Sequence, residues 1–168
     1  LIPWIESAKA VRNVDGMSTA SSRIIAIAFG GEDYTNDMGV QRTDQGEEVY
    51  VPRANVAIAA RAADIISLDG PYVAFQNPEG LRDDAKLAQQ LGYKGKFAIH
   101  PSQIDIINAT FSPSSEDVEY AKRVIKEWEK AESQGRGSLN LDGKMVDVPV
   151  VKRAENLLAL VAQINSQG

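Results

Sequence analysis

The segment "IIAIAFGGEDYTNDMG" (residues 24–39) decides the fold class, because an uninterrupted apolar run passes directly into two glycines and three carboxylates. A run without alternation is typical of a strand that is covered on both faces, as in a parallel α/β sheet. Glu32, Asp33 and Asp37 would then follow the end of the strand, where parallel architectures place their functional loops. The segment therefore predicts a buried parallel strand that leads into a charged loop.

Three further β-rich runs, at residues 1–5, 64–70 and 96–100, each precede a segment that is compatible with a helix. The alternation of strands and helices predicts right-handed parallel crossovers, either in a barrel or in an open doubly wound sheet. The helical stripes expected after the second and third strands are Ala54, Ile58 and residues 61–63, and Leu81, Ala85, Ala88 and Leu91, with Gly92 as the terminating glycine.

The pattern changes near residue 112. Ser114 and Asp117 form a plausible capping box for a helix that continues to about Glu132. An Asp-Gly pair between short apolar runs predicts a tight hairpin, and a final helix follows it. The apolar stripes expected on the two helices are Val118, Ala121, Ile125 and Trp128, and Val150, Ala154, Leu157, Leu158 and Val161. We therefore divide the chain into an α/β part, residues 1–112, and a helix–hairpin–helix extension, residues 113–168.

Composition excludes several classes of function. The 168 residues are 43% hydrophobic and carry a net charge of −5, so no basic field would attract nucleic acid or anionic lipid. No stretch approaches the ~20 apolar residues of a membrane span. The chain has no cysteine and a single histidine, which excludes the usual ligands of zinc and leaves oxygen ligands for a metal. Such a chain suits the cytoplasm or the mitochondrial matrix.

A metal site is expected at the strand ends. Glu6 follows the first strand and Asp33 the second, and neighbouring strands lie only ~4.8 Å apart. Two carboxylates completed by water or substrate oxygens are the usual ligands of Mg²⁺. Gly30 and Gly31 would allow close approach of a substrate, whose carboxylate their N–H groups could bind. The alternative is that the acidic residues only cap and solvate a short helix.

Three other residues admit two interpretations. His100, followed by Pro101, lies at a strand end and either contacts a ligand or packs in a hydrogen-bonded structural role. Asp69 either faces the same strand-end site as Glu6 and Asp33 or belongs to a turn. Asp147 precedes the last helix, where an ordinary N-cap is the simpler interpretation of the residues alone.

Six separated segments together resemble one known family. They are "LIPWIES" (1–7), "AFGGEDYTNDMG" (28–39), "LDGPYVAFQNPEGL" (68–81), "KGKFAIHPSQI" (94–104), "FSPSSEDVEYAKRVI" (111–125) and "GKMVDVPVVKRAENLL" (143–158). In this order, and over nearly the whole chain, they are similar to the citrate lyase beta-subunit-like family of acyl-CoA lyases, which includes citramalyl-CoA and malyl-CoA lyases.

The resemblance implies the second half of a (β/α)8 TIM barrel, strands five to eight, with a carboxyl-terminal extension. It assigns Mg²⁺ to Glu6 and Asp33. It places Asp147 in a lid that often closes over a neighbouring subunit, as proton donor and acceptor, and this replaces the preference for a simple cap. Substrate binding is assigned to Gly30, Gly31, Glu32, His100 and Pro101.

The family reaction is reversible carbon–carbon cleavage of a β-hydroxyacyl-CoA thioester to acetyl-CoA and a 2-oxo acid. The resemblance also implies a homo-oligomer, a trimer or hexamer. The family's first barrel half, with its arginine for the substrate carboxylate, has no counterpart in these residues. We therefore expect the chain to be a fragment, inactive in isolation, whose partner is the missing N-terminal half. Two alternatives are a pyruvate-type aldolase that acts on free 2-oxo acids and a non-catalytic assembly module.

Overall fold

The computed structural model describes residues 1–43 and 45–167 of the chain. They form two units, Leu1–Phe111 and a second that begins at Ser112, and each is described by itself. Among the described residues, no helix has the length and the hydropathy that a membrane crossing requires.

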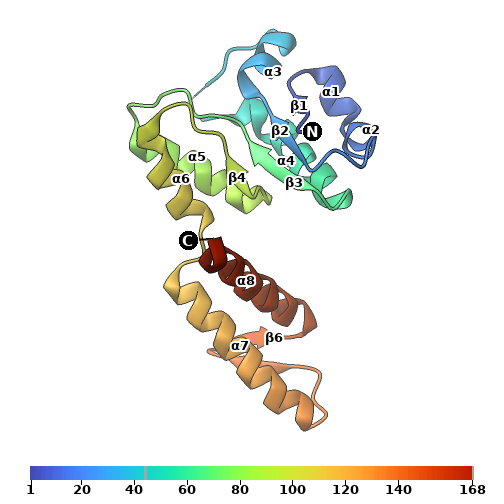
Figure 1. Ribbon diagram of the computed structural model, residues 1–168, viewed down its shortest axis with the longest axis vertical. Coiled ribbons are helices and arrows are strands. Elements are labelled where there is room, and N and C mark those ends of the chain that lie inside the picture. Colours follow the sequence, from blue (N-terminus) through green and yellow to red (C-terminus); the bar gives the residue numbers. More distant parts are fainter. Residues whose placement is uncertain (44, 168) are drawn as a thin grey trace. The chain divides into compact units, whose positions relative to one another are not determined.

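A parallel four-stranded sheet organises the first unit, in the order β1-β2-β3-β4 (Figure 1). The strands are β1 (Trp4–Ile5), β2 (Ala26–Phe29), β3 (Ile66–Asp69) and β4 (Gly95–Lys96). Sequential strands are neighbours, so every connection is a crossover that carries helices, as the alternating pattern predicts. All four residues of β2 are buried, in agreement with a strand that is covered on both faces.

Helices connect the strands in the same unit. Two short helices, α1 (Ala8–Arg12) and α2 (Val14–Ser18), follow β1, and α3 (Gly31–Met38) and α4 (Glu47–Ala62) follow β2. The third connection is α5 (Pro78–Leu91), and β4 is followed by the 3₁₀ turn η1 (Pro101–Gln103) and α6 (Ile104–Phe111). The predicted stripe of α5 is confirmed, because Leu81, Ala85 and Ala88 are buried. Gly92 ends that helix in the left-handed conformation, at φ 104°.

Several predictions for this unit are wrong in detail. The first strand was expected over residues 1–5, but only Trp4–Ile5 belongs to the sheet. The fourth strand was expected over residues 96–100, but only Gly95–Lys96 is extended in the sheet, because the Gln103 side chain accepts the hydrogen bond of the Ile99 N–H at 2.9 Å. On α4, Ile58 of the predicted stripe is exposed, and so are Arg61 and Ala62. The buried face of that helix instead carries Val49, Arg53, Val56, Ala57 and Ala60.

The core of the first unit lies between the sheet and these helices. It is built around fully buried side chains of β1, β2 and α4, including Ile5, Ile27, Phe29 and Val56. Trp4 of β1 also contacts Phe97, just beyond β4, with ring centroids 4.6 Å apart. This aromatic contact links the two outer strands of the sheet.

The second unit is a pair of helices with a hairpin between them in sequence (Figure 1). It contains α7 (Ser115–Ser133), β5 (Leu139–Leu141), β6 (Lys144–Val146) and α8 (Val148–Gln167). The capping box of Ser114 and Asp117 is present. The predicted hairpin is also confirmed, with Asp142 and Gly143 both at positive φ, as a tight two-residue turn requires. A separate apolar core, which includes Val124, Val146 and Val151, holds the unit together.

Candidate metal and substrate site

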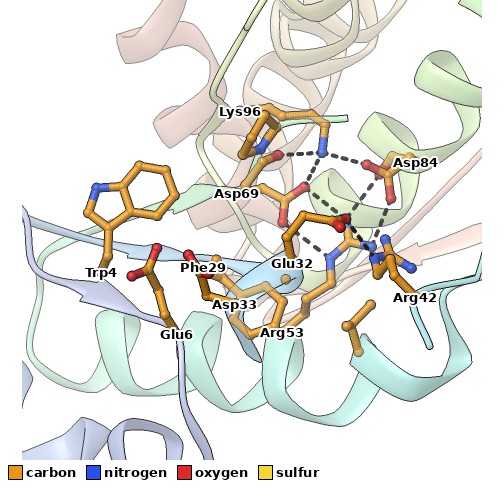
Figure 2. A pocket seen from close by; sticks show the side chains of 15 residues that line it. Trp4, Glu6, Phe29, Glu32, Asp33, Arg42, Arg53, Asp69, Asp84 and Lys96 are labelled. Carbon is orange, nitrogen blue, oxygen red and sulfur yellow. Dashed lines mark hydrogen bonds and ion pairs between the residues drawn. The ribbon is translucent and has the colours of Figure 1, made fainter. Parts of the chain in front are cut away.

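A pocket of about 110 Å³ lies at the carboxyl ends of the parallel strands. Its lining includes Trp4 and Glu6 from β1 and the turn after it, the segment 29–33 at the end of β2, and the segment 69–71 at the end of β3. Figure 2 shows Trp4 and Glu6 on one side of this pocket and a network of ion pairs on the other. The strand ends therefore form a polar mouth, as expected for a parallel α/β architecture.

Glu6 and Asp33, the two predicted metal ligands, both line this pocket. Glu6 is partly buried, whereas Asp33 lies in the first turn of α3 and is exposed. Burial raises the pKa of Glu6, and the negative charge of Asp33 raises that pKa further. The two carboxylates are thus close enough to repel each other. A cation between them would remove that repulsion.

The Glu6 side chain packs against the backbone at Gly30. A Cβ atom at position 30 would lie 2.5 Å from Cγ and 2.6 Å from Oε1 of Glu6, closer than any real contact. The Gly30 N–H also donates to the carbonyl oxygen of Ile5 at 3.1 Å, which links the end of β2 to the residue before Glu6. Gly31, the first residue of α3, lines the pocket as well. Glycine at position 30 therefore allows the Glu6 side chain to lie directly against the backbone.

Glu32 lines the same pocket but points its charge toward a different partner. Its Oε1 lies 3.8 Å from Nε of Arg42, and the Glu32 side chain is 55% exposed. Arg42 is held more tightly by Glu48, with 2.7 Å between Nη1 and Oε1. Arg42 thus remains close to Glu32 and adds one positive charge to the rim of the pocket.

A buried network of four charges forms the other wall of the pocket. Arg53 donates from Nε to Oδ1 of Asp69 at 3.2 Å and from Nη2 to Oδ2 at 2.8 Å. Its Nη1 donates to Asp84 at 2.9 Å. Lys96 donates to Oδ2 of Asp69 at 2.6 Å and to the carbonyl oxygen of Gly70 at 2.7 Å, and it pairs with Asp84. The network joins α4, β3, α5 and β4, and its charges sum to zero.

Each charge in this network is stabilised by its opposite. Burial alone would raise the pKa of Asp84, but Lys96 and Arg53 outweigh burial and lower it. Burial alone would likewise lower the pKa of Arg53, but Asp69 and Asp84 outweigh burial and raise it. Since the donors of Arg53 and Lys96 already have carboxylate and carbonyl partners, the network rigidifies the strand ends.

Sequence reasoning left the role of Asp69 open and missed Arg53, Asp84 and Lys96. One signal was available for Arg53, because it occurs at helical spacing within the apolar stripe of Val49, Val56 and Ala60. A charged residue on a buried helix face requires a buried partner of opposite sign. The identity of that partner follows only from the three-dimensional arrangement.

The donor set of the pocket suits Mg²⁺ better than a structural zinc ion. Among the residues that the structure describes, no group of three or more His, Cys, Asp or Glu side chains gathers to enclose an ion. A closed structural zinc site needs about four such ligands, whereas Mg²⁺ is commonly held by one or two carboxylates and completes its shell with water or substrate oxygens. Glu6 and Asp33 fit the second pattern.

His100 and Pro101 do not belong to the lining of this pocket. The His100 ring stacks on Phe75, with centroids 4.9 Å apart, and its Nδ1 accepts a hydrogen bond from the Ser102 N–H at 3.2 Å. His100 thereby caps η1, whose first residue is Pro101. These contacts agree with the structural interpretation of His100, and a role of either residue in substrate binding stays a prediction.

Asp147 lies in the second unit, immediately before α8. Its carbonyl oxygen accepts hydrogen bonds from the N–H groups of Val150 and Val151, both at 3.0 Å, and its Oδ1 lies 3.4 Å from the Val150 nitrogen. Asp147 therefore sits at the N-cap position of α8. Because the two units are described separately, its catalytic role stays a prediction.

The chain is similar to known proteins in sequence and in structure. The model of the HpcH/HpaI aldolase/citrate lyase family matches residues 1–101. The citrate lyase subunit beta of Haemophilus influenzae is 40% identical over 94% of this chain and 54% of its own length. The mitochondrial citramalyl-CoA lyase of Rattus norvegicus is 27% identical over 99% of this chain and 52% of its own length. The chain thus spans about half the length of the curated relatives it matches.

A solved structure agrees with the sequence matches. The crystal structure of CitE from Mycobacterium tuberculosis in complex with magnesium, acetoacetate and coenzyme A has a TM-score of 0.81 and 28% identity, over 94% of this chain and 59% of that chain. The α/β fold is therefore similar to that of the citrate lyase beta-subunit enzymes, and the resemblance inferred from the six sequence segments is confirmed. With more than half of its residues matched by the family model, the chain belongs to the HpcH/HpaI aldolase/citrate lyase family.

Proposed function

We propose that this chain carries the metal-binding part of a Mg²⁺-dependent lyase, which cleaves a β-hydroxyacyl-CoA thioester into acetyl-CoA and a 2-oxo acid. The observation that carries the proposal is the meeting of Glu6 and Asp33 in one pocket at the ends of neighbouring parallel strands. The relatives named citrate lyase and citramalyl-CoA lyase support the reaction class. The CitE complex with magnesium, acetoacetate and coenzyme A supports the choice of cofactor and thioester.

Each part of the pocket has a proposed task. Glu6 and Asp33 hold Mg²⁺, which when bound would stabilise the negative charge that develops on substrate oxygens as the carbon–carbon bond breaks. The backbone N–H group of Gly31 receives the carboxylate of the oxo acid, assisted by the positive N-terminus of α3. The Gly30 N–H, for which the sequence predicted the same task, already donates to the carbonyl oxygen of Ile5, so Gly30 contributes only its lack of a side chain. Glu32 orients the substrate at the rim.

Asp147 is proposed as the acid and base at the acetyl carbon. A carboxylate accepts a proton when the enolate of the thioester forms in the condensation direction, and it returns the proton in the cleavage direction. General acid–base catalysis of this kind contributes roughly 10² to 10⁴-fold to a rate. The N-cap position leaves one carboxylate oxygen of Asp147 available, because only Oδ1 approaches the Val150 nitrogen.

The parallel sheet is proposed to be four strands of an eight-stranded barrel, strands five to eight, with the rest of the barrel supplied by residues outside this chain. Two findings support this: the chain spans about half the length of its relatives, and β1 and β4 are at the two edges of the sheet. Such edges of unpaired backbone groups are normally covered in native proteins. Isolated residues 1–168 should then be inactive, and a homo-oligomer, a trimer or hexamer, would allow Asp147 to serve a neighbouring subunit.

The test uses the full-length protein with citramalyl-CoA, malyl-CoA and citryl-CoA, each with and without Mg²⁺, and with the corresponding free acids. We expect thioester cleavage that requires Mg²⁺, and loss of most of that activity in Glu6→Gln, Asp33→Asn and Asp147→Asn. Asp15→Asn, which changes an exposed carboxylate outside the pocket, is the matched control. Cleavage of the free acid alone would favour the aldolase alternative. Absence of both Mg²⁺ binding and cleavage would favour the assembly module.

A further inference from the structure

Asp37 belongs to the charged segment after β2, but the proposed chemistry assigns it no role. It lies in the last turn of α3 and is exposed, and it is absent from the lining of the pocket. Its Oδ2 nevertheless accepts a hydrogen bond from the Ala8 N–H at 2.8 Å, across 29 residues of sequence. Ala8 is the first residue of α1 and stands two positions after Glu6. Asp37 therefore ties the segment that carries Glu6 to α3.

The same helix carries the second proposed ligand. Asp33 and Asp37 are four residues apart, so they lie on one face of α3, one turn from each other. Asp33 faces the Glu6 carboxylate in the pocket, while Asp37 binds the backbone at Ala8. Helix α3 thus contacts the segment 6–8 at two successive turns.

Glu6 is also anchored on its other side. The Gly30 N–H donates to the carbonyl oxygen of Ile5 at 3.1 Å, immediately before Glu6 in the chain. The two ties therefore flank Glu6, one at residue 5 and one at residue 8. Without a cation the carboxylates of Glu6 and Asp33 repel each other, so the segment needs an anchor that keeps them together.

We propose that Asp37 is a positioning residue, which holds Glu6 opposite Asp33 so that both can share one Mg²⁺ ion. This inference rests on the proposed function, since it assumes that Glu6 and Asp33 bind the metal. It assigns to Asp37 a task that depends on its acceptor oxygen and not on its charge. That distinction separates positioning from direct or electrostatic binding of the ion.

The donor and the acceptor of this hydrogen bond can each be removed by one substitution. Asp37→Ala removes the acceptor. Ala8→Pro removes the donor, and proline suits the first residue of a helix. Ser7, which precedes it, already has φ −146° and ψ 159°, the extended conformation that proline requires of its neighbour. Asp37→Asn keeps an acceptor oxygen and removes the charge.

The experiment is titration calorimetry of Mg²⁺ into the full-length protein, with thermal unfolding of every variant. We expect Asp37→Ala and Ala8→Pro each to weaken the Kd about 4- to 12-fold, the upper part of the range expected for loss of one ordinary hydrogen bond. The double variant should lose no more than either single variant, because both remove the same contact. Asp37→Asn should stay within about threefold of the wild type, and Asp15→Ala should bind as the wild type does.

Two results would overturn the inference. One is unchanged Mg²⁺ affinity in both Asp37→Ala and Ala8→Pro. The other is a loss in Asp37→Asn as large as that in Asp37→Ala, which would indicate a role of the charge. Glu6→Gln, measured in parallel, separates this inference from the proposed function: if it too binds Mg²⁺ as the wild type does, the metal site itself is wrong and the positioning role falls with it.

Discussion

Substitution of Gly30 by alanine is expected to weaken Mg²⁺ binding while leaving the fold nearly intact. The new Cβ would lie 2.5 Å from Cγ and 2.6 Å from Oε1 of Glu6. Gly30 has φ −111° and ψ 95°, an extended conformation that alanine also adopts, so the backbone itself is not strained. The closest conflict is therefore with the Glu6 side chain, which is flexible and only partly buried.

The size of the effect follows from how far Glu6 must move. Carbon atoms in ordinary contact lie ~3.5–4.0 Å apart, so the Glu6 side chain must retreat by about 1 Å. Mg²⁺ demands ligands at ~2.0–2.1 Å, and a misplacement of about 1 Å in an active site can cost ~10²-fold. We expect the Kd for Mg²⁺ to rise about 10- to 100-fold, equivalent to about 1.4–2.7 kcal/mol. The free energy of unfolding should change by less than about 1 kcal/mol.

The measurement is Mg²⁺ titration calorimetry of the full-length protein, together with urea unfolding. Gly16→Ala is the matched control, because a Cβ at Gly16 would meet nothing within 4 Å. It should bind Mg²⁺ as the wild type does and gain up to ~1 kcal/mol of stability, since Gly16 lies in α2. If Gly30→Ala binds Mg²⁺ with wild-type affinity, Glu6 does not hold the ion and the steric reasoning is refuted.

Two further predictions concern stability. Lys96→Met leaves Asp69 and Asp84 with one buried cation instead of two and should cost about 3–5 kcal/mol in urea unfolding; a loss no larger than that of breaking an exposed ion pair elsewhere would contradict the importance of the network. For Glu48, burial alone would raise the pKa, but hydrogen bonds from Thr43 and Arg42 lower it to about 2. Its contribution of about 1–3 kcal/mol is therefore present above pH ~4.5 and lost as the pH falls toward 2. Glu48→Gln should flatten this acid dependence of unfolding, and an unchanged profile would show that Glu48 is not its source.

Local signals in the sequence were sufficient for much of the fold. The continuous apolar run of residues 24–29 identified β2 because burial on both faces removes alternation. The capping box at Ser114 and the Asp-Gly turn at residues 142–143 act through hydrogen bonds and φ angles of adjacent residues, so they can be read without a partner. Glu6 and Asp33 line one pocket because β1 and β2 are neighbours, a strand order that the alternating pattern allows but does not fix.

Features that depend on distant partners could not be derived in this way. The short fourth strand results from competition by the Gln103 side chain for the Ile99 N–H. Arg53 lies on the buried face of α4, where Asp69 and Asp84 neutralise it, while Ile58 lies on another face of the helix, which is exposed. Both outcomes depend on residues that are brought together by the fold, and intrinsic helix and strand propensities do not predict such contacts.

Each of the three carboxylates in the segment after β2 has a different neighbour. Glu32 and Asp33 lie in the first turn of α3, where the helix dipole favours negative charge. Glu32 faces Arg42, and Asp33 faces Glu6. Asp37 lies in the last turn, where the dipole of α3 disfavours a carboxylate, yet it meets the first N–H of α1. The hydrogen bond to Ala8 compensates for this unfavourable position. Under the proposed function, the three carboxylates then have three separate tasks: Glu32 lies at the rim, Asp33 binds the cation, and Asp37 anchors the segment that carries Glu6.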